Sequence, residues 1–149
     1  MKKGQSIGLS VLAIVFLLLF FEVGRPVLYE VPSNLNGWFT VQYDDASCPP
    51  LSSKGIYRVV VVSLNRFACT SSPMEKHWHA EKFEYVVADG RTVPILSGDH
   101  GVDDQVRAWP VSTNPDRHQE YDYVGPESAV ARGNPPFAGL PDQPDRPLR

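Results

Sequence analysis

Two short stretches of the 149-residue chain combine histidine with acidic residues. His77 and His79 are separated by one residue, so on a strand both imidazoles would project from the same face and could share a metal ion. Asp99 and His100 begin a second stretch, next to a glycine, that offers oxygen and nitrogen ligands. A site using His77, His79 and His100 needs the two stretches to meet in the fold, which their spacing does not show.

Solvated polar turns explain these two stretches equally well. We therefore expect no metal and no other cofactor, and we keep a metal-binding protein or metal-dependent hydrolase as the alternative. Nucleophilic catalysis would pair Cys69 with His77, or Ser71 with His79, but the chain has no G-x-S-x-G elbow. We expect no catalytic residue.

An apolar segment occupies the N-terminus, where residues 7–21 read IGLSVLAIVFLLLFF after Lys2 and Lys3. This order is typical of an export signal, and the lysines favour a cytoplasmic N-terminus. No small-residue cleavage site follows, and the first cysteine lies too far along the chain for lipid attachment. We predict a hydrophobic helix within residues 1–25 that stays uncleaved and anchors the chain in the bacterial inner membrane through residues 7–23. The alternative is a cleaved signal peptide and a secreted or periplasmic domain.

Cys48 and Cys69 are the two cysteines, and both follow the export segment. An even number of cysteines in an oxidising compartment favours pairing, so we predict a disulfide between them. Free thiols or an intermolecular bridge are the alternatives.

The charge balance bears on the choice of partner. The formal net charge is -3, and the first 25 residues carry +2 (Lys2, Lys3 and Arg25 against Glu22), which leaves -5 for the remainder. Nucleic-acid binding requires clustered lysine and arginine, so we exclude nucleic acid as a partner.

Short runs of alternating apolar residues begin at Val27 and indicate half-buried strands. Residues 28–31 form a first strand that ends at Pro32. Residues 38–43 alternate, with Phe39, Val41 and Tyr43 on one face. After a long predicted loop over residues 44–55, the β-branched segment 56–64 is expected to form the central strand.

The dipeptide Asp89-Gly90 predicts a tight hairpin between strands over residues 82–87 and 92–95, and Pro94 places the second of these at an edge. Residues 105–111 alternate weakly and are expected to add a last strand. Residues 125–149 contain six prolines and few large apolar side chains, so we predict a disordered, proline-rich tail. The fold class is therefore all-β, a small antiparallel β-sandwich or barrel-like domain over residues 27–124.

Five short motifs follow one another over residues 31–95: Val-Pro at 31–32, Gly-Trp at 37–38, Cys-Pro-Pro-Leu at 48–51, Cys-Thr-Ser-Ser-Pro at 69–73, and Tyr-Val with Asp-Gly-Arg within 85–91. In their order and spacing the chain resembles a family of uncharacterised bacterial exported proteins, a domain of unknown function. The resemblance implies a small secreted or membrane-tethered β-domain. It supplies no substrate, cofactor or catalytic residue.

Aromatic side chains are frequent in the predicted strands, and most are expected in the core. One or two exposed rings would suit a protein partner in the cell envelope. We therefore expect a non-enzymatic envelope domain with a binding or structural role. The aromatic candidates are Trp38, Tyr43, Tyr57, Trp78, Tyr85 and Trp109.

Overall fold

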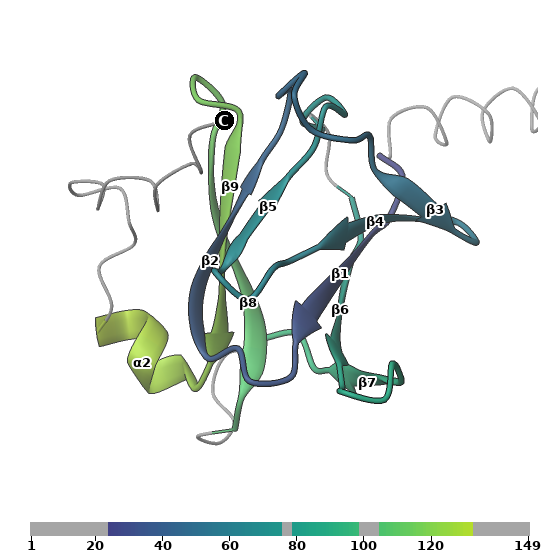
Figure 1. Cartoon of the computed structure of the whole chain (residues 1–149). Coiled ribbons are helices and arrows are strands. Elements are labelled where there is room, and N and C mark those ends of the chain that lie inside the picture. Colours follow the sequence, from purple (N-terminus) through teal and green to yellow (C-terminus); the bar gives the residue numbers. More distant parts are fainter. Residues whose placement is uncertain (1–23, 76–78, 99–104, 133–149) are drawn as a thin grey trace, which may run out of the picture.

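The computed structural model describes residues 24–75, 79–98 and 105–132. Nine strands in these residues form two sheets that pack face to face (Figure 1). The all-β class predicted from the sequence is confirmed. No helix among the described residues is long and apolar enough to cross a membrane, and the predicted anchor over residues 7–23 lies outside them.

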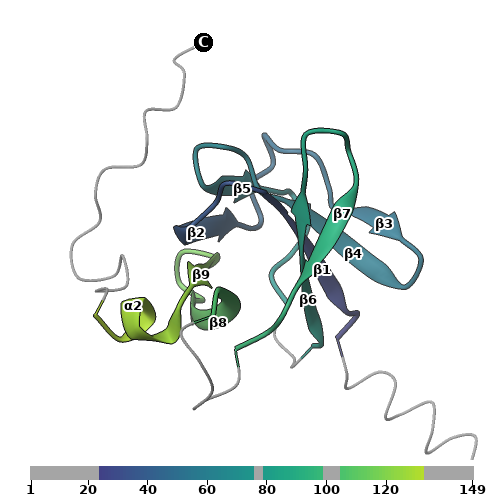
Figure 2. The same cartoon turned by 90° about the horizontal axis from the view of Figure 1, so that it is seen from below.

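The first sheet has the strand order β3-β4-β1-β6-β7 and the second has the order β5-β2-β9-β8. In the first sheet the strands are β3 (Ser52–Lys54), β4 (Tyr57–Val61), β1 (Val27–Pro32), β6 (Glu81–Val86) and β7 (Thr92–Ile95). In the second they are β5 (Phe67–Cys69), β2 (Gly37–Gln42), β9 (Gln119–Gly125) and β8 (Arg107–Asn114). The two layers are seen end-on in Figure 2.

The core lies between the sheets and is built from alternate strand residues. Tyr29 of β1 stacks on Phe83 of β6 with ring centroids 4.6 Å apart, and its ring lies 6.2 Å from that of Phe39 in β2. Phe39, Val41 and Tyr43 are all buried, as their spacing predicted. Burying such side chains from both sheets is the main stabilising contribution in a sandwich.

The prediction of antiparallel pairing throughout is wrong for three strand pairs. β1 runs parallel to both β4 and β6, and β2 runs parallel to β5. β1 and β2 are joined by a tight turn, in which the Leu35 amide donates to the Pro32 carbonyl at 2.9 Å, but they belong to different sheets. They therefore do not pair with each other as a hairpin, and each pairs with strands from later in the chain. Alternation reveals the two faces of a strand but not the direction of its neighbours.

The central strand of the first sheet is β1, not the β-branched segment that we expected there. β1 is buried on both faces, since Leu28 is as inaccessible as Tyr29. β4 lies one place from the edge, and its Val61 is 62% exposed. The β6–β7 hairpin and the edge position of β7 are as predicted.

Four described elements fall where no strand or helix was predicted. β3 lies in the predicted loop over residues 44–55, β5 follows the expected strand over residues 56–64, and β9 lies beyond the expected last strand. The tail begins with helix α2 (Glu127–Arg132), which corrects the prediction of disorder there. α2 contacts β9, and Figure 2 shows it on the side of the second sheet that faces away from the first. Residues 133–149 lie outside the described part of the chain.

Candidate functional site

A cavity of about 250 Å³ lies between the two sheets and is lined largely by polar and acidic side chains. Its walls come from the segment before β6, from the first residue of β6, and from β8 and β9. Pro110 and Thr113 of β8 are exposed at its rim, whereas Glu120 and Asp122 of β9 are buried. The cavity therefore has an open mouth and an acidic floor.

The register of β9 places both acidic side chains on the inner face of the second sheet. Glu120 pairs with Val41 and Asp122 pairs with Phe39, two core residues of β2. Residues that face each other in a ladder share a face, so Glu120 and Asp122 point to the interior. Their exposed fractions are only 6% and 1%.

Two tyrosine hydroxyls hold the carboxylate of Glu120. The Tyr29 hydroxyl donates a hydrogen bond to Oε1, and the Tyr43 hydroxyl donates to Oε2 at 2.9 Å. Burial, reinforced by the charge of Glu120, raises the pKa of both tyrosines, so the hydroxyls keep their protons and remain donors. Because Tyr29 belongs to the first sheet and Tyr43 follows β2 of the second, this carboxylate ties the two sheets together.

Glu81, the first residue of β6, forms part of the opposite wall of the cavity. Burial, with a further contribution from the charge of Glu120, raises its pKa to about 7. His79 lies beside it, with Nε2 3.4 Å from Oε1 of Glu81. Near neutral pH, part of the Glu81 side chains therefore keep a proton that an ordinary glutamate would have lost.

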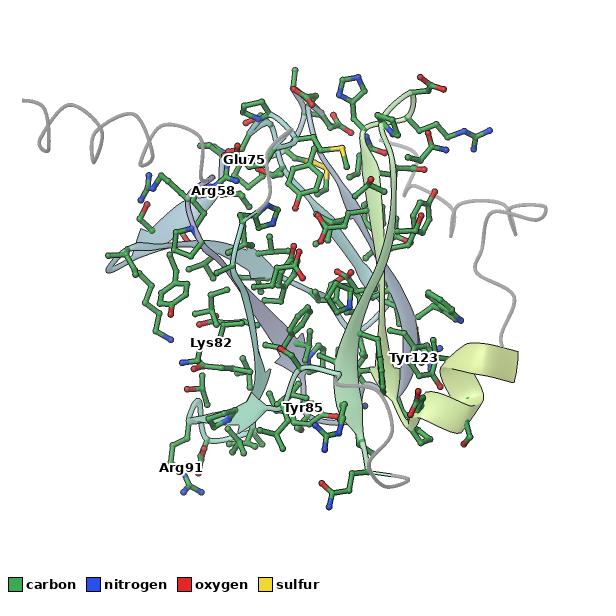
Figure 3. All side chains as sticks on the ribbon, turned by 180° about the vertical axis from the view of Figure 1, so that it is seen from behind. Arg58, Glu75, Lys82, Tyr85, Arg91 and Tyr123 are labelled. Carbon is green, nitrogen blue, oxygen red and sulfur yellow. A yellow bond between two sulfur atoms is a disulfide. The ribbon has the colours of Figure 1, made fainter. Side chains whose placement is uncertain are left out.

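The lining carries more acidic than basic groups. Glu75 also lines the cavity, but it is paired with Arg58 of β4 at 2.8 Å, and the two side chains lie side by side in Figure 3. Glu81, Glu120 and Asp122 line it as well, and no lysine or arginine is among the described residues of the lining. Among the described lining residues, His79 is the one whose side chain contains nitrogen.

Of the predicted metal ligands, His79 lies in the wall of this cavity. His77, Asp99 and His100 are outside the described residues, so their predicted roles are not tested. Among the described residues, three possible ligand atoms come within 4.8 Å of one another only at Asp45, Cys48 and Cys69. The two sulfur atoms there form a disulfide and are not free to bind a metal.

The predicted Cys48–Cys69 disulfide is present, with the two Cα atoms 5.8 Å apart. The parallel pairing of β2 with β5 places Cys69 opposite Gln42. Beyond this pair the Asp45 amide donates to the Thr70 carbonyl at 3.1 Å, which brings the Cys48 loop back over β5. The fold-back that the disulfide requires is thus built by backbone hydrogen bonds.

A second hollow, of about 330 Å³, lies beside this disulfide. It is lined by aliphatic residues of β2, β4 and β5 and by the loop that contains Pro49 and Pro50. No charged side chain is among the described residues that line it. Because binding sites combine apolar walls with a few polar groups that fix orientation, we place the functional site in the acidic cavity instead.

Sequence reasoning missed Glu120 and Asp122, and it did not foresee that Tyr29 and Tyr43 hold Glu120. The signal that could have revealed the two acids is the run Glu-Tyr-Asp-Tyr-Val over residues 120–124, an alternating strand pattern with acids on one face. A face occupied by acids does not resemble the face of a strand that points to a core, so no strand was predicted there.

Comparison with known proteins shows no matching family model and no matching curated protein. Among solved structures, the chain is similar to a candidate lipoprotein from Bacillus anthracis, with 15% sequence identity and a TM-score of 0.49. The match covers 85% of this chain and 87% of that one. So distant a likeness says nothing about function, and the resemblance to exported proteins of unknown function stays a prediction.

Proposed function

We propose that this chain is a non-enzymatic, extracytoplasmic binding domain whose acidic cavity receives a positively charged organic group, an ammonium or a guanidinium. The observation that carries the proposal is the gathering of Glu81, Glu120 and Asp122 around one cavity, with no lysine or arginine among the described residues that line it. Like charges in a partly dry space repel one another, and a bound cation would relieve this repulsion.

The spacing of the carboxylates supports an organic cation rather than a metal ion. A metal needs several ligand atoms close to a single point, which the described lining residues do not provide. An ammonium or guanidinium group carries several N–H donors and binds carboxylates one at a time around its surface. A volume of about 250 Å³ suits a group the size of a basic side chain.

A hydrolase with two carboxylates is the strongest enzymatic rival. Glu81, with a pKa of about 7, has the property of a general acid, and a second carboxylate is near. We favour binding because both oxygens of Glu120 already accept hydrogen bonds from tyrosine hydroxyls, so this carboxylate is held in place by the protein itself. The small cavity also leaves little space for a substrate with a bond to be cleaved.

Location outside the cytoplasm is part of the proposal. The export-type segment over residues 7–21 and the disulfide in the described fold both favour an oxidising compartment. We propose that the domain is tethered to the inner membrane by residues 7–23 and faces the envelope.

The test is titration of the full chain, in a neutral detergent, with n-butylammonium and with n-butylguanidinium. We expect at least one to bind, with n-butanol as the neutral control showing no binding. Glu81→Gln should weaken the binding about 10-fold or more, because a hydrogen bond to a charged group contributes about 1.5–3 kcal/mol. Glu84→Gln removes a carboxylate from the outer face of the same strand and should leave the affinity unchanged. Absence of binding by both cations would refute the proposal.

The metal-binding alternative is tested on the same preparation. Elemental analysis that finds stoichiometric zinc or copper, lost in a His77→Ala, His79→Ala double variant, would replace the proposal with a metal site. Under the proposal the protein is metal-free and the double variant still binds the organic cation.

A further inference from the structure

Three of the four edge strands in the described fold are blunted. β3 and β5 have three residues each. The Cys48 loop also lies against the chain just after β5, where the Ser71 amide donates a hydrogen bond to the Pro49 carbonyl at 3.3 Å. β7 has four residues, of which Pro94 cannot donate to a neighbour. Proteins shield edges in these ways because an open edge pairs with other chains.

β8 differs from these edges because it is eight residues long. On the outer side of β8, the described residues pair only with the start of this strand. There Ser97 bridges to Ala108, and the Ala108 amide donates to the Leu96 carbonyl at 2.9 Å. From Ser112 to Asn114 no described strand lies on that side. Within the described part of the chain, this half of β8 is an edge able to accept a further strand.

The open half of β8 borders the acidic cavity. A register shift between Pro110 and Ser112 marks a β-bulge, a feature that redirects the side chains following it. Ser112 and Thr113 line the cavity immediately after the bulge. Across the mouth, β7 pairs with β6 only from Phe83 onward, so Glu81 has no β7 residue beside it.

We infer that β8 accepts an extended peptide as an added strand, and that a lysine or arginine side chain of this peptide enters the acidic cavity. Main-chain hydrogen bonds to residues 112–114 would hold the peptide, and the cavity would select its basic side chain. Side chains of a strand alternate between its two faces, so one residue of the peptide points between the sheets while its neighbours stay outside. The inference rests on the proposed function and names its partner.

The charges favour a basic segment of another protein over a second copy of this chain. The part of the chain after residue 25 carries a net charge of -5, which attracts a basic peptide. Two copies paired through β8 would bring two acidic cavities together, and their charges would repel.

The experiment uses the full chain and the fluorescent pentapeptide acetyl-Thr-Val-Lys-Val-Thr-amide, with n-butylammonium as the small cation. We expect the peptide to bind at least 10-fold more tightly than the amine. Replacement of its lysine by norleucine should weaken binding by at least 10-fold, and so should Glu81→Gln in the protein. Amide hydrogen exchange at residues 112–114 should slow when the peptide binds.

Backbone N-methylation decides whether a strand is added. In a strand, alternate N–H groups point to the same neighbour, so methylation of one alternate set should reduce affinity at least 10-fold. Methylation of the other set should change it less than about 3-fold. Equal effects of the two sets, or exchange at residues 112–114 that does not slow, would overturn the inference.

The outcomes of these measurements distinguish this inference from the proposed function. Amine binding that depends on Glu81, with a peptide no tighter than the amine, would refute strand addition and leave the cationic cavity in place. Failure of the amines and the peptide alike would refute the proposed function and the inference with it. Equal binding of the norleucine and lysine peptides would refute the entry of a basic side chain into the cavity.

Discussion

Glu81 and Glu120 face the same cavity, and burial together with the charge of Glu120 raises the pKa of Glu81 to about 7. Glutamate in an unfolded chain loses its proton near pH 4.5, so the folded state holds more protons between that pH and about 7. When the folded state binds more protons, the free energy of unfolding falls as the pH rises. Glu81 is therefore a built-in source of instability above neutral pH in the absence of a ligand.

The first prediction is that the free energy of unfolding decreases from about pH 4.5 to pH 7, and that Glu81→Gln flattens this decrease. At pH 8 the variant should be more stable by about 1–2 kcal/mol, once solvent screening of the partly exposed group is allowed for. Urea unfolding at several pH values measures this. In Glu84→Gln the decrease should persist, because hydrogen bonding from Lys82 lowers the pKa of Glu84 and removes it from this pH range. A Glu81→Gln variant with the wild-type pH profile would contradict the assignment.

The second prediction concerns the hydroxyl that Tyr43 donates to Glu120. Tyr43→Phe leaves Oε2 of Glu120 without this donor, so we expect a loss of about 1.5–3 kcal/mol in the free energy of unfolding. Tyr57→Phe, on the outer face of the first sheet, serves as the control and should cost less than about 0.5 kcal/mol. Equal losses in the two variants, measured by urea unfolding at pH 6, would show that Glu120 does not depend on Tyr43.

At the scale of the elements, sequence reasoning succeeded where one face of a strand is apolar. β2 and the β6–β7 hairpin follow directly from alternation and from the Asp89-Gly90 turn. It failed at β9, whose inner face carries Glu120 and Asp122, and at β1, which is buried on both faces and so was not recognised as central. The candidate site was missed for the same reason, since its acids occupy positions where a fold-based pattern expects apolar residues.

The third prediction concerns the elements joined by the disulfide. Cys48 and Cys69 enclose a loop of about 22 residues, and in the chain-entropy model its closure contributes about 3 kcal/mol. The Cys48→Ser, Cys69→Ser double variant should lose about this amount in the free energy of unfolding, whereas the wild-type protein should show no reactive thiol when unfolded without reductant. Two reactive thiols per wild-type chain would contradict the disulfide.

For the whole molecule, the sequence predicts two parts with different surroundings: an apolar N-terminal segment and a disulfide-containing β-sandwich. The predicted anchor and the sandwich are consistent in one respect, because disulfides form and persist mainly outside the cytoplasm. A small domain that binds a basic segment of an envelope protein would benefit from a tether, which keeps it near its partner.

The fourth prediction tests the tether by fractionation of cells that express the chain with a C-terminal tag. We expect the full-length protein in the membrane fraction, accessible to protease added outside the inner membrane. Cleavage of the signal would instead remove about 2.5 kDa and release the protein into the soluble periplasm. That result would replace the anchored domain with a secreted one and leave the cavity unaffected.

The central claim is that the cavity binds a cation against ionised carboxylates, and proton release on binding tests it most directly. At pH 7 about half of the Glu81 side chains are protonated, and a bound cation should expel these protons. Calorimetric titration of the full chain with n-butylammonium, in buffers of different ionisation enthalpy, should therefore show release of roughly half a proton per ligand bound. Glu81→Gln should abolish this release. Binding without proton release in the wild-type protein, or no binding at all, would contradict the account.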